Sequence, residues 1–207
     1  MDKIADGLCI VTTGGTFDKI YDEIRGELTF RRSHLPKILK AARCAVPVSV
    51  KRLLALDSLN MEASHRKKIA EACSKRPERR IIVTHGTDTM VETARVVAAR
   101  KLDKVIVFTG AMVPFALENS DAVFNLGCAF TAVQLLGPGV YLCMSGKVFA
   151  YDQVRKNREL GIFEGFSLQS TPATAGAGDP GMKGINTPGQ ALENGGSASI
   201  AAPRGEA

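Results

Sequence analysis

Three loops of this sequence combine glycine with small hydroxyl or acidic side chains. They are Thr12-Thr13-Gly14-Gly15-Thr16, His85-Gly86-Thr87-Asp88 and Thr109-Gly110-Ala111-Met112. Glycine lets the backbone turn sharply and lets a ligand approach the main chain closely. A threonine hydroxyl becomes a nucleophile when a neighbouring group takes up its proton. For each loop taken alone, an ordinary strand-to-loop turn with capping threonines is the alternative.

A second group of polar residues can supply charge and proton transfer. Asp57-Ser58 follow a β-branched run, and Lys156 stands in Val154-Arg155-Lys156-Asn157. A lysine that is held by an aspartate and partly desolvated can accept a proton from a threonine hydroxyl, so Asp88 and Lys156 gain interest as a pair. Taken singly, Asp88 fits a helix-capping residue and Lys156 a surface lysine. For His85 we favour a core histidine.

Several other kinds of site are not indicated. The first loop lacks a following Lys-Ser/Thr pair and a Gly-x-Gly-x-x-Gly pattern, which speaks against phosphate and dinucleotide loops. No Gly-x-Ser-x-Gly elbow is visible. The five cysteines are odd in number, widely spaced and without a Cys-x-x-Cys pair, so we expect buried thiols and neither a disulfide framework nor a zinc site. No metal or cofactor is predicted.

The elements that must position these residues alternate between strand and helix. Apolar runs without polar alternation predict strands that are buried on both faces of a parallel sheet. The predicted strands are residues 8–11, 27–30, 47–54, 80–84, 105–108 and 140–144, with 147–151 pairing nearby. The predicted helices are residues 33–42, 64–74, 90–100 and 122–136. This order implies βαβ units whose polar loops meet in one crevice at the carboxyl ends of the strands.

Two local features refine this outline. Thr89 with Glu92 has the form of a capping box at the start of the helix over residues 90–100. We expect one domain over residues 1–164, and a disordered tail over residues 165–207, because glycine, proline and serine dominate there and periodicity ends.

Bulk properties describe a soluble globular protein. The 207 residues are 45% hydrophobic and 23% charged, and no apolar run is long enough to span a bilayer. The amino-terminus lacks the basic and apolar regions of a signal peptide, so we expect a cytoplasmic location. The net charge is +6. Its basic clusters fall on separate predicted elements without interleaved aromatic residues, which favours solvated faces over a nucleic-acid interface.

The loops resemble a known family. Thr13-Gly14-Gly15-Thr16, His85-Gly86-Thr87-Asp88-Thr89-Met90 and Gly110-Ala111-Met112 closely resemble the two signature stretches and the third-loop motif of bacterial-type L-asparaginases, in the family's order and at compatible spacing. The resemblance covers about residues 8–164, which correspond to the family's amino-terminal domain. It implies a flavodoxin-like, Rossmann-like α/β fold, with helices on both faces of a mostly parallel sheet.

The resemblance also implies catalytic roles. Thr13 stands where the family has its nucleophile, and Tyr21 is the nearby candidate for the tyrosine that polarises this hydroxyl. Thr87 and Asp88 match a second threonine and an aspartate that contacts the α-amino group of the substrate. Lys156 matches the lysine that is hydrogen-bonded to that second threonine.

Substrate-binding roles follow in the same way. Ser58 matches the serine that binds the α-carboxylate of the substrate, and Ala111 matches the residue whose carbonyl contacts the side-chain amide. The substrate-binding set implied by the resemblance is Asp57, Ser58, Gly14, Gly86 and Ala111.

Three departures from the family pattern bear on the expected activity. Leu59 stands where many relatives carry a polar residue, and Val113 replaces an arginine. The family's smaller carboxyl-terminal domain, which helps to build the dimer interface and the neighbouring site, has no counterpart in this sequence. We therefore expect a homo-oligomer that pairs differently.

The expected activity is hydrolysis of L-asparagine, and possible use of L-glutamine stays open. Thr13 would form an acyl-enzyme that water cleaves to L-aspartate, with release of ammonia. Two alternatives are an asparaginase-like amidase component of a multi-subunit system, as in tRNA-dependent amidotransferases, and a non-catalytic module that binds asparagine or aspartate.

Overall fold

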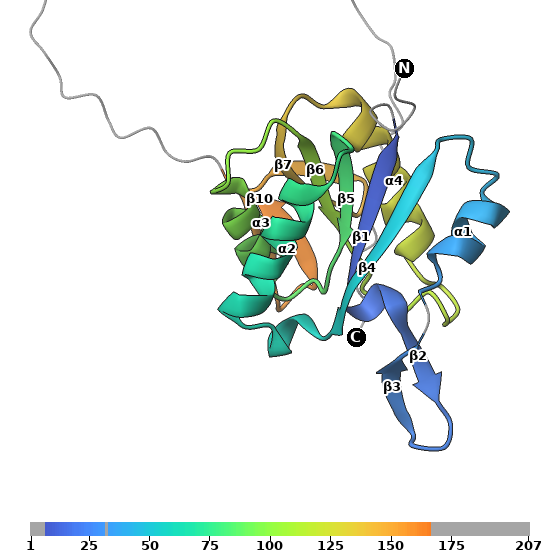
Figure 1. The fold of residues 1–207 in the computed structure, drawn as a ribbon. Helices are drawn as coiled ribbons and strands as arrows, with labels where there is room; N and C mark the ends of the chain where they lie inside the picture. Colours follow the sequence, from blue (N-terminus) through green and yellow to red (C-terminus); the bar gives the residue numbers. More distant parts are fainter. Residues whose placement is uncertain (1–6, 32, 167–207) are drawn as a thin grey trace, which may run out of the picture. The chain divides into compact units, whose positions relative to one another are not determined.

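A six-stranded sheet forms the centre of the structure, a computed structural model that describes residues 7–31 and 33–166 (Figure 1). Its strands run in the order β4-β1-β5-β6-β7-β8. Their bounds are β1 (Leu8–Gly14), β4 (Val48–Leu56), β5 (Arg80–Thr84), β6 (Val105–Thr109), β7 (Gly139–Met144) and β8 (Lys147–Ala150). All neighbours pair in parallel except β7 and β8, which are antiparallel. Counted along the chain, the parallel strands lie in the order 2-1-3-4-5, which confirms the predicted flavodoxin-like fold.

Helices cover both faces of this sheet. The helices α1 (Leu35–Ala41) and α4 (Ala122–Leu135) lie on one face, and α2 (Ala63–Lys75) and α3 (Met90–Ala98) lie on the other (Figure 1). Successive residues of β1 point to opposite faces, so Ile10 packs with α1 and α4 whereas Val11 packs with α2 and α3. All seven residues of β1 are buried, which explains its unbroken apolar run.

Two small antiparallel hairpins complete the described fold. The first joins β2 (Lys19–Asp22) and β3 (Glu27–Phe30), and the second joins β9 (Val154–Asn157) and β10 (Ile162–Gly165). Two short 3-10 helices, η1 (Thr16–Asp18) and η2 (Ser58–Asn60), follow β1 and β4. The sequence pattern predicted β3 but not the β9–β10 hairpin, which carries Lys156 opposite Phe163.

The predicted capping box at α3 is wrong. Thr89 makes no side-chain cap and instead donates a 2.8 Å hydrogen bond to the carbonyl of Ser58, while Glu92 pairs with Arg66. The Thr89 hydroxyl therefore bonds to a carbonyl distant in sequence, whereas the local pattern predicted a bond to the backbone at the start of α3. A capping box is present at α2, between Glu62 and the ring of His65.

Two predictions concern the carboxyl-terminal residues and membrane-spanning segments. The predicted disordered tail lies, from residue 167 onward, outside the described residues. Among the helices that are described, none has both the length and the hydropathy that crossing a membrane requires.

Candidate functional site

The loop after β1 holds Thr13 deep in the protein. Thr13 is fully buried, and its Oγ1 donates a 2.8 Å hydrogen bond to the carbonyl of Thr84 on β5. Gly14 and Gly15 follow with φ angles of 101° and 73°, which residues with a Cβ rarely adopt. The amide of Gly15 donates to the carbonyl of Leu56, so the turn is fixed against the end of β4.

The polar loops approach one another most closely at Gly15, Gly86 and Gly110, where a side chain would not fit. A Cβ on Gly15 would collide with the backbone of Gly86, and a Cβ on Gly86 would lie 2.5 Å from Ser58 Oγ. A Cβ on Gly110 would lie 2.5 Å from the carbonyl oxygen of His85 and 3.5 Å from Thr87 Cγ2. The loops after β1, β4, β5 and β6 therefore meet at the carboxyl ends of the parallel strands, as the strand pattern predicted.

Lys156 joins the second loop from a distant part of the chain. Its ammonium group donates hydrogen bonds of 2.8 Å to Thr87 Oγ1 and 2.8 Å to Asp88 Oδ1. The Lys156 side chain is 12% exposed and the Asp88 side chain 32% exposed. The structure thus brings together the threonine, aspartate and lysine that the sequence singled out. The geometry suits proton exchange between a hydroxyl and an amine that a carboxylate holds in place.

Ser58 and Asp57 differ in what they can offer a ligand. Ser58 Oγ is buried and has no hydrogen-bond partner among the described residues. Asp57 is already occupied, because Oδ2 lies 2.5 Å from Lys19 Nζ and Oδ1 accepts the amide of Leu59 at 3.1 Å. Partial burial raises the pKa of Asp57, but the bonds from Lys19 and from backbone amides outweigh it and leave this pKa below its usual value. Sequence reasoning missed the Lys19–Asp57 ion pair.

Tyr21 is not brought to Thr13. It lies on β2, opposite Leu28, in a hairpin that projects from the end of the sheet (Figure 1). Its side chain is 58% exposed, and no hydrogen bond between described residues joins it to Thr13.

His85 is buried beside the site. One ring nitrogen, Nδ1, lies 2.8 Å from the carbonyl of Gly86, while Nε2 has no partner among the described residues. Burial lowers the pKa of His85 to about 4, so the ring is neutral near pH 7. This environment agrees with the interpretation as a core histidine, although one nitrogen remains unsatisfied.

The third loop is held by two residues that sequence reasoning missed. The carboxylate of Asp121 accepts the amides of Met112 and Val113 at 3.0 Å. Asn125 Nδ2 donates to the carbonyl of Gly110 at 3.0 Å, and Ala111 between them is fully buried. The available signal was an aspartate directly before the apolar run of α4, a position that commonly binds free amides.

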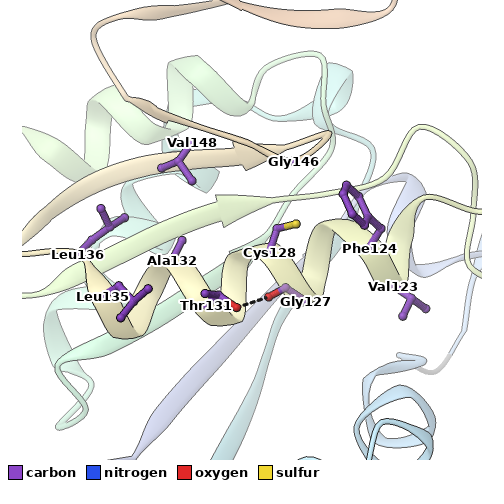
Figure 2. A pocket seen from close by; sticks show the side chains of 10 residues that line it. All are labelled: Val123, Phe124, Gly127, Cys128, Thr131, Ala132, Leu135, Leu136, Gly146 and Val148. Atoms are coloured by element: carbon purple, nitrogen blue, oxygen red, sulfur yellow. Dashed lines mark hydrogen bonds between the residues drawn. The ribbon is translucent and has the colours of Figure 1, made fainter. Parts of the chain in front are cut away.

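Two other surface features lie away from these loops. A groove of about 580 Å³ runs along α4, where apolar side chains such as Ala132 and Leu136 point toward Val148 of β8 (Figure 2). A cleft of about 360 Å³ between α2 and β4 is lined by Lys51, Lys68, Lys75 and Arg76, so basic residues from three stretches of the sequence share one surface. Neither feature includes a predicted site residue.

Comparison with known proteins identifies the family of this chain. The family model described as "Asparaginase, N-terminal" matches residues 7–178. The L-asparaginase of Thermococcus kodakarensis is 36% identical over 84 residues, which are 40% of this chain and 26% of that protein. A glutamyl-tRNA(Gln) amidotransferase subunit of Methanopyrus kandleri is 32% identical over 159 residues, which are 70% of this chain and 34% of that protein.

Solved structures give the same result. The thermostable L-asparaginase from Thermococcus kodakarensis matches with a TM-score of 0.66 and 28% identity, over 77% of this chain and 51% of that one. The probable cytoplasmic L-asparaginase from Campylobacter jejuni matches with a TM-score of 0.60 and 29% identity, over 72% and 49%. The chain thus spans about a quarter to a third of these curated relatives and about half of these structures. It belongs to the asparaginase family and matches the amino-terminal domain of that family.

Proposed function

We propose that this protein hydrolyses the side-chain amide of L-asparagine to L-aspartate and ammonia. The observation that carries the proposal is the pair of 2.8 Å hydrogen bonds from Lys156 to Thr87 and Asp88, next to the buried loop of Thr13. The name L-asparaginase borne by the Thermococcus relative supports the choice of substrate.

The proposed reaction has two halves. Thr13 Oγ1 attacks the amide carbon, its proton passes through the relay to the departing nitrogen, and ammonia leaves an aspartyl ester on Thr13. Water then adds to the ester carbon, gives one proton back to Thr13 and releases aspartate. Backbone amides near Gly14 or at Thr87-Asp88 would stabilise the oxyanion, an effect of about 3 kcal/mol for each donor.

This mechanism requires rearrangement around Thr13. The Thr13 hydroxyl must leave the carbonyl of Thr84 to turn toward a substrate. Tyr21 can polarise that hydroxyl only after the β2–β3 hairpin has moved inward, because the tyrosine is 58% exposed. Thr87 and Lys156 would relay the proton in concert, with the ammonium group held by Asp88 giving up one proton as it takes another.

Substrate recognition would use groups on the neighbouring loops. Ser58 Oγ, buried without a partner among the described residues, would donate to the α-carboxylate. Asp88 would accept from the α-amino group, and the carbonyl of Ala111 would accept from the side-chain amide. Glutamine is longer by one methylene, a difference that a pocket discriminates by only about 1–3 kcal/mol.

The second candidate function is that of an amidase that works together with a partner protein. It is favoured by the amidotransferase component from Methanopyrus, whose match covers 70% of this chain.

We further propose a homo-oligomer when no partner is present. The Campylobacter relative, described as a probable cytoplasmic L-asparaginase, supports the cytoplasm as the location.

Ammonia release tests the proposal. The purified protein is supplied with L-asparagine or L-glutamine, beside Thr87→Val and Lys156→Met. Lys67→Met is the matched control, because Lys67 is an exposed lysine of α2. We expect release from asparagine that persists in the control and is lost in both site variants. Equal release in all four proteins would contradict the assigned site. No ammonia release at millimolar asparagine would contradict the proposal that the protein hydrolyses asparagine alone. The partner-dependent amidase would then be the remaining candidate, and activity would be expected only after the partner protein is added.

A further inference from the structure

Asn125 connects three segments of the fold from a fully buried position. Its Nδ2 donates to the carbonyl of Gly110 at 3.0 Å and to Asp121 Oδ2 at 2.8 Å. Its Oδ1 accepts the amide of Ser145 at 2.9 Å. One side chain therefore ties α4 to the loop after β6 and to the turn between β7 and β8.

The turn at Ser145 needs such a support. Ser145 has a φ of 51°, a left-handed conformation that costs free energy for a residue with a Cβ, and Gly146 follows with a φ of 76°. The bond from the Ser145 amide to Asn125 holds this strained residue in place. The Ser145 amide also fixes Oδ1 of Asn125. The side-chain amide of Asn125 therefore has only one orientation in which Oδ1 accepts from Ser145 and Nδ2 donates to its two acceptors.

The loop after β6 is fixed on its other side by Asp121. This carboxylate accepts the amides of Met112 and Val113 at 3.0 Å, and Asn125 Nδ2 is a further donor to it. If Asn125 lost its donor, the Asp121 carboxylate would keep the two amides but lose the side-chain donor that holds it from α4. Both anchors of the loop therefore depend on Asn125.

This loop touches the site through Gly110. A Cβ on Gly110 would lie 2.5 Å from the carbonyl oxygen of His85, so the loop after β6 and the loop after β5 approach too closely there for any other residue. The amide of His85 also donates to the carbonyl of Thr109 at 2.9 Å. A displacement of Gly110 therefore shifts the backbone of His85, two residues before Thr87, whose hydroxyl accepts the hydrogen bond from Lys156.

We propose that Asn125 is a positioning residue: through Gly110 it sets where the loop that carries Ala111 stands against Thr87. Asn125 itself touches neither Thr87 nor Lys156 by a hydrogen bond. Its effect on turnover rests on the proposed amide hydrolysis, whereas its effect on the loop can be measured without any substrate.

The substrate-free test is amide hydrogen exchange in Asn125→Asp. This variant has nearly the same shape, but it places an oxygen where the Nδ2 donor faces Gly110 O and the Asp121 carboxylate. We expect the amides of Met112 and Val113 to exchange at least about tenfold faster, as the loss of one hydrogen bond allows. Amides of α3 should keep their protection.

The control is Thr131→Val. Thr131 lies on the same helix, but its hydroxyl bonds within the helix, to Gly127 O, away from the loop (Figure 2). This variant should exchange like the parent protein. Should Asn125→Asp fail to fold, Asp121→Asn, which weakens the second anchor, carries the same expectation for Met112 and Val113.

Kinetics then tests the link to the reaction. In a parent protein that releases ammonia from asparagine, Asn125→Asp should lower kcat by about 10- to 100-fold, as expected for misplaced reacting groups. The KM should rise by a smaller factor than kcat falls, because Ser58 and Asp88 are untouched and only the Ala111 carbonyl moves with the loop.

The outcomes separate this inference from the proposed function. Unchanged exchange at Met112 and Val113 overturns the positioning role, whatever the activity. Faster exchange with unchanged kcat overturns the link from the loop to Thr87. A parent protein without activity overturns the proposed function alone, while the exchange experiment still decides whether Asn125 positions the loop.

Discussion

The Lys156 ammonium group donates a 2.8 Å hydrogen bond to Thr87 Oγ1 across 69 residues of sequence. The hairpin that presents Lys156 is anchored by Val154 and Phe163, which are buried in the core formed with α2 and α3. The placement of the lysine therefore depends on apolar packing behind it.

Phe163→Ala tests this dependence. The variant should lose about 3–5 kcal/mol of unfolding free energy in urea, because a large buried ring leaves a cavity. Ammonia release should fall as well, since Lys156 loses its support. Phe124→Ala is the matched control, because Phe124 is 60% exposed, and its effect should stay near 0.5 kcal/mol. Similar losses in both variants would contradict an anchoring role.

Replacement of glycine by alanine should have opposite effects at Gly86 and at Gly127. In Gly86→Ala the new methyl group would lie 2.5 Å from Ser58 Oγ, so the loops must separate and activity should be lost. In Gly127→Ala the Cβ of a residue inside α4 meets nothing within 4 Å. Alanine there should raise stability by about 0.5–1 kcal/mol, because it favours the helix. Thermal unfolding and ammonia release measured together check both statements, and an active Gly86→Ala would show that close loop contact is dispensable.

Acid should destabilise the protein through His85. Burial holds the pKa of His85 at about 4, below the value of 6.5 expected in the unfolded chain. Between these values the unfolded chain binds a proton that the folded protein does not, so stability falls as pH drops through this window. With about 1.4 kcal/mol for each pKa unit, the loss is about 3 kcal/mol.

The measurement compares urea unfolding at pH 7 and pH 4.5. The parent protein should lose more stability on acidification than His85→Asn, whose side chain does not titrate. The difference between the two proteins isolates the imidazole from carboxylates that respond to the same pH change. Equal acid sensitivity would mean that His85 is not buried in its neutral form.

A buried ion pair at the amino end of the sheet should matter more for stability than an exposed one. Glu78 is 3% exposed, accepts from Arg76 at 2.7 Å and from Ser49 at 2.5 Å, and its pKa is lowered to about 2, chiefly by the hydrogen bond from Arg76. Glu78→Ala removes the carboxylate partner of Arg76, whose side chain is 28% exposed, and should cost about 2–3 kcal/mol.

The matched control is Asp103→Ala. Asp103 pairs with Arg79 at 2.8 Å, but both side chains are more than half exposed. Breaking this pair should cost less than about 1 kcal/mol in urea unfolding. If the two alanine variants lose equal stability, burial of Glu78 is not what makes its ion pair important.

The sequence predicted most of the fold because the relevant signals are local. The inner strands of the parallel sheet contain continuous apolar runs, and each run leads into a loop with glycine or a hydroxyl, as at Thr13-Gly14 and Gly86-Thr87. The β9–β10 hairpin escaped prediction because Val154–Asn157 is short and charged, and each of its strands places only one apolar side chain in the core, Val154 and Phe163. Such a pair gains stability only from the folded core.

The site was predictable in composition but not in geometry. Thr87, Asp88 and Lys156 were singled out together, and they meet. The hydrogen bond from Thr13 to the carbonyl of Thr84 depends on the register of two strands, which no local pattern encodes. The role of Asn125 was hidden for a similar reason, since its partners belong to three separate segments.

Peptide mapping of the protein during incubation with L-asparagine tests the central claim most directly. The protein is mixed with L-asparagine, quenched in acid within the first turnovers, digested and analysed by mass spectrometry, with Thr13→Val as the control. We predict an aspartyl ester on the peptide that contains Thr13, formed as ammonia is released and absent from the variant. An ester on the peptide that contains Thr87 would contradict the account. So would ammonia release without any detectable ester, if the Thr13→Val variant released ammonia as fast as the parent protein.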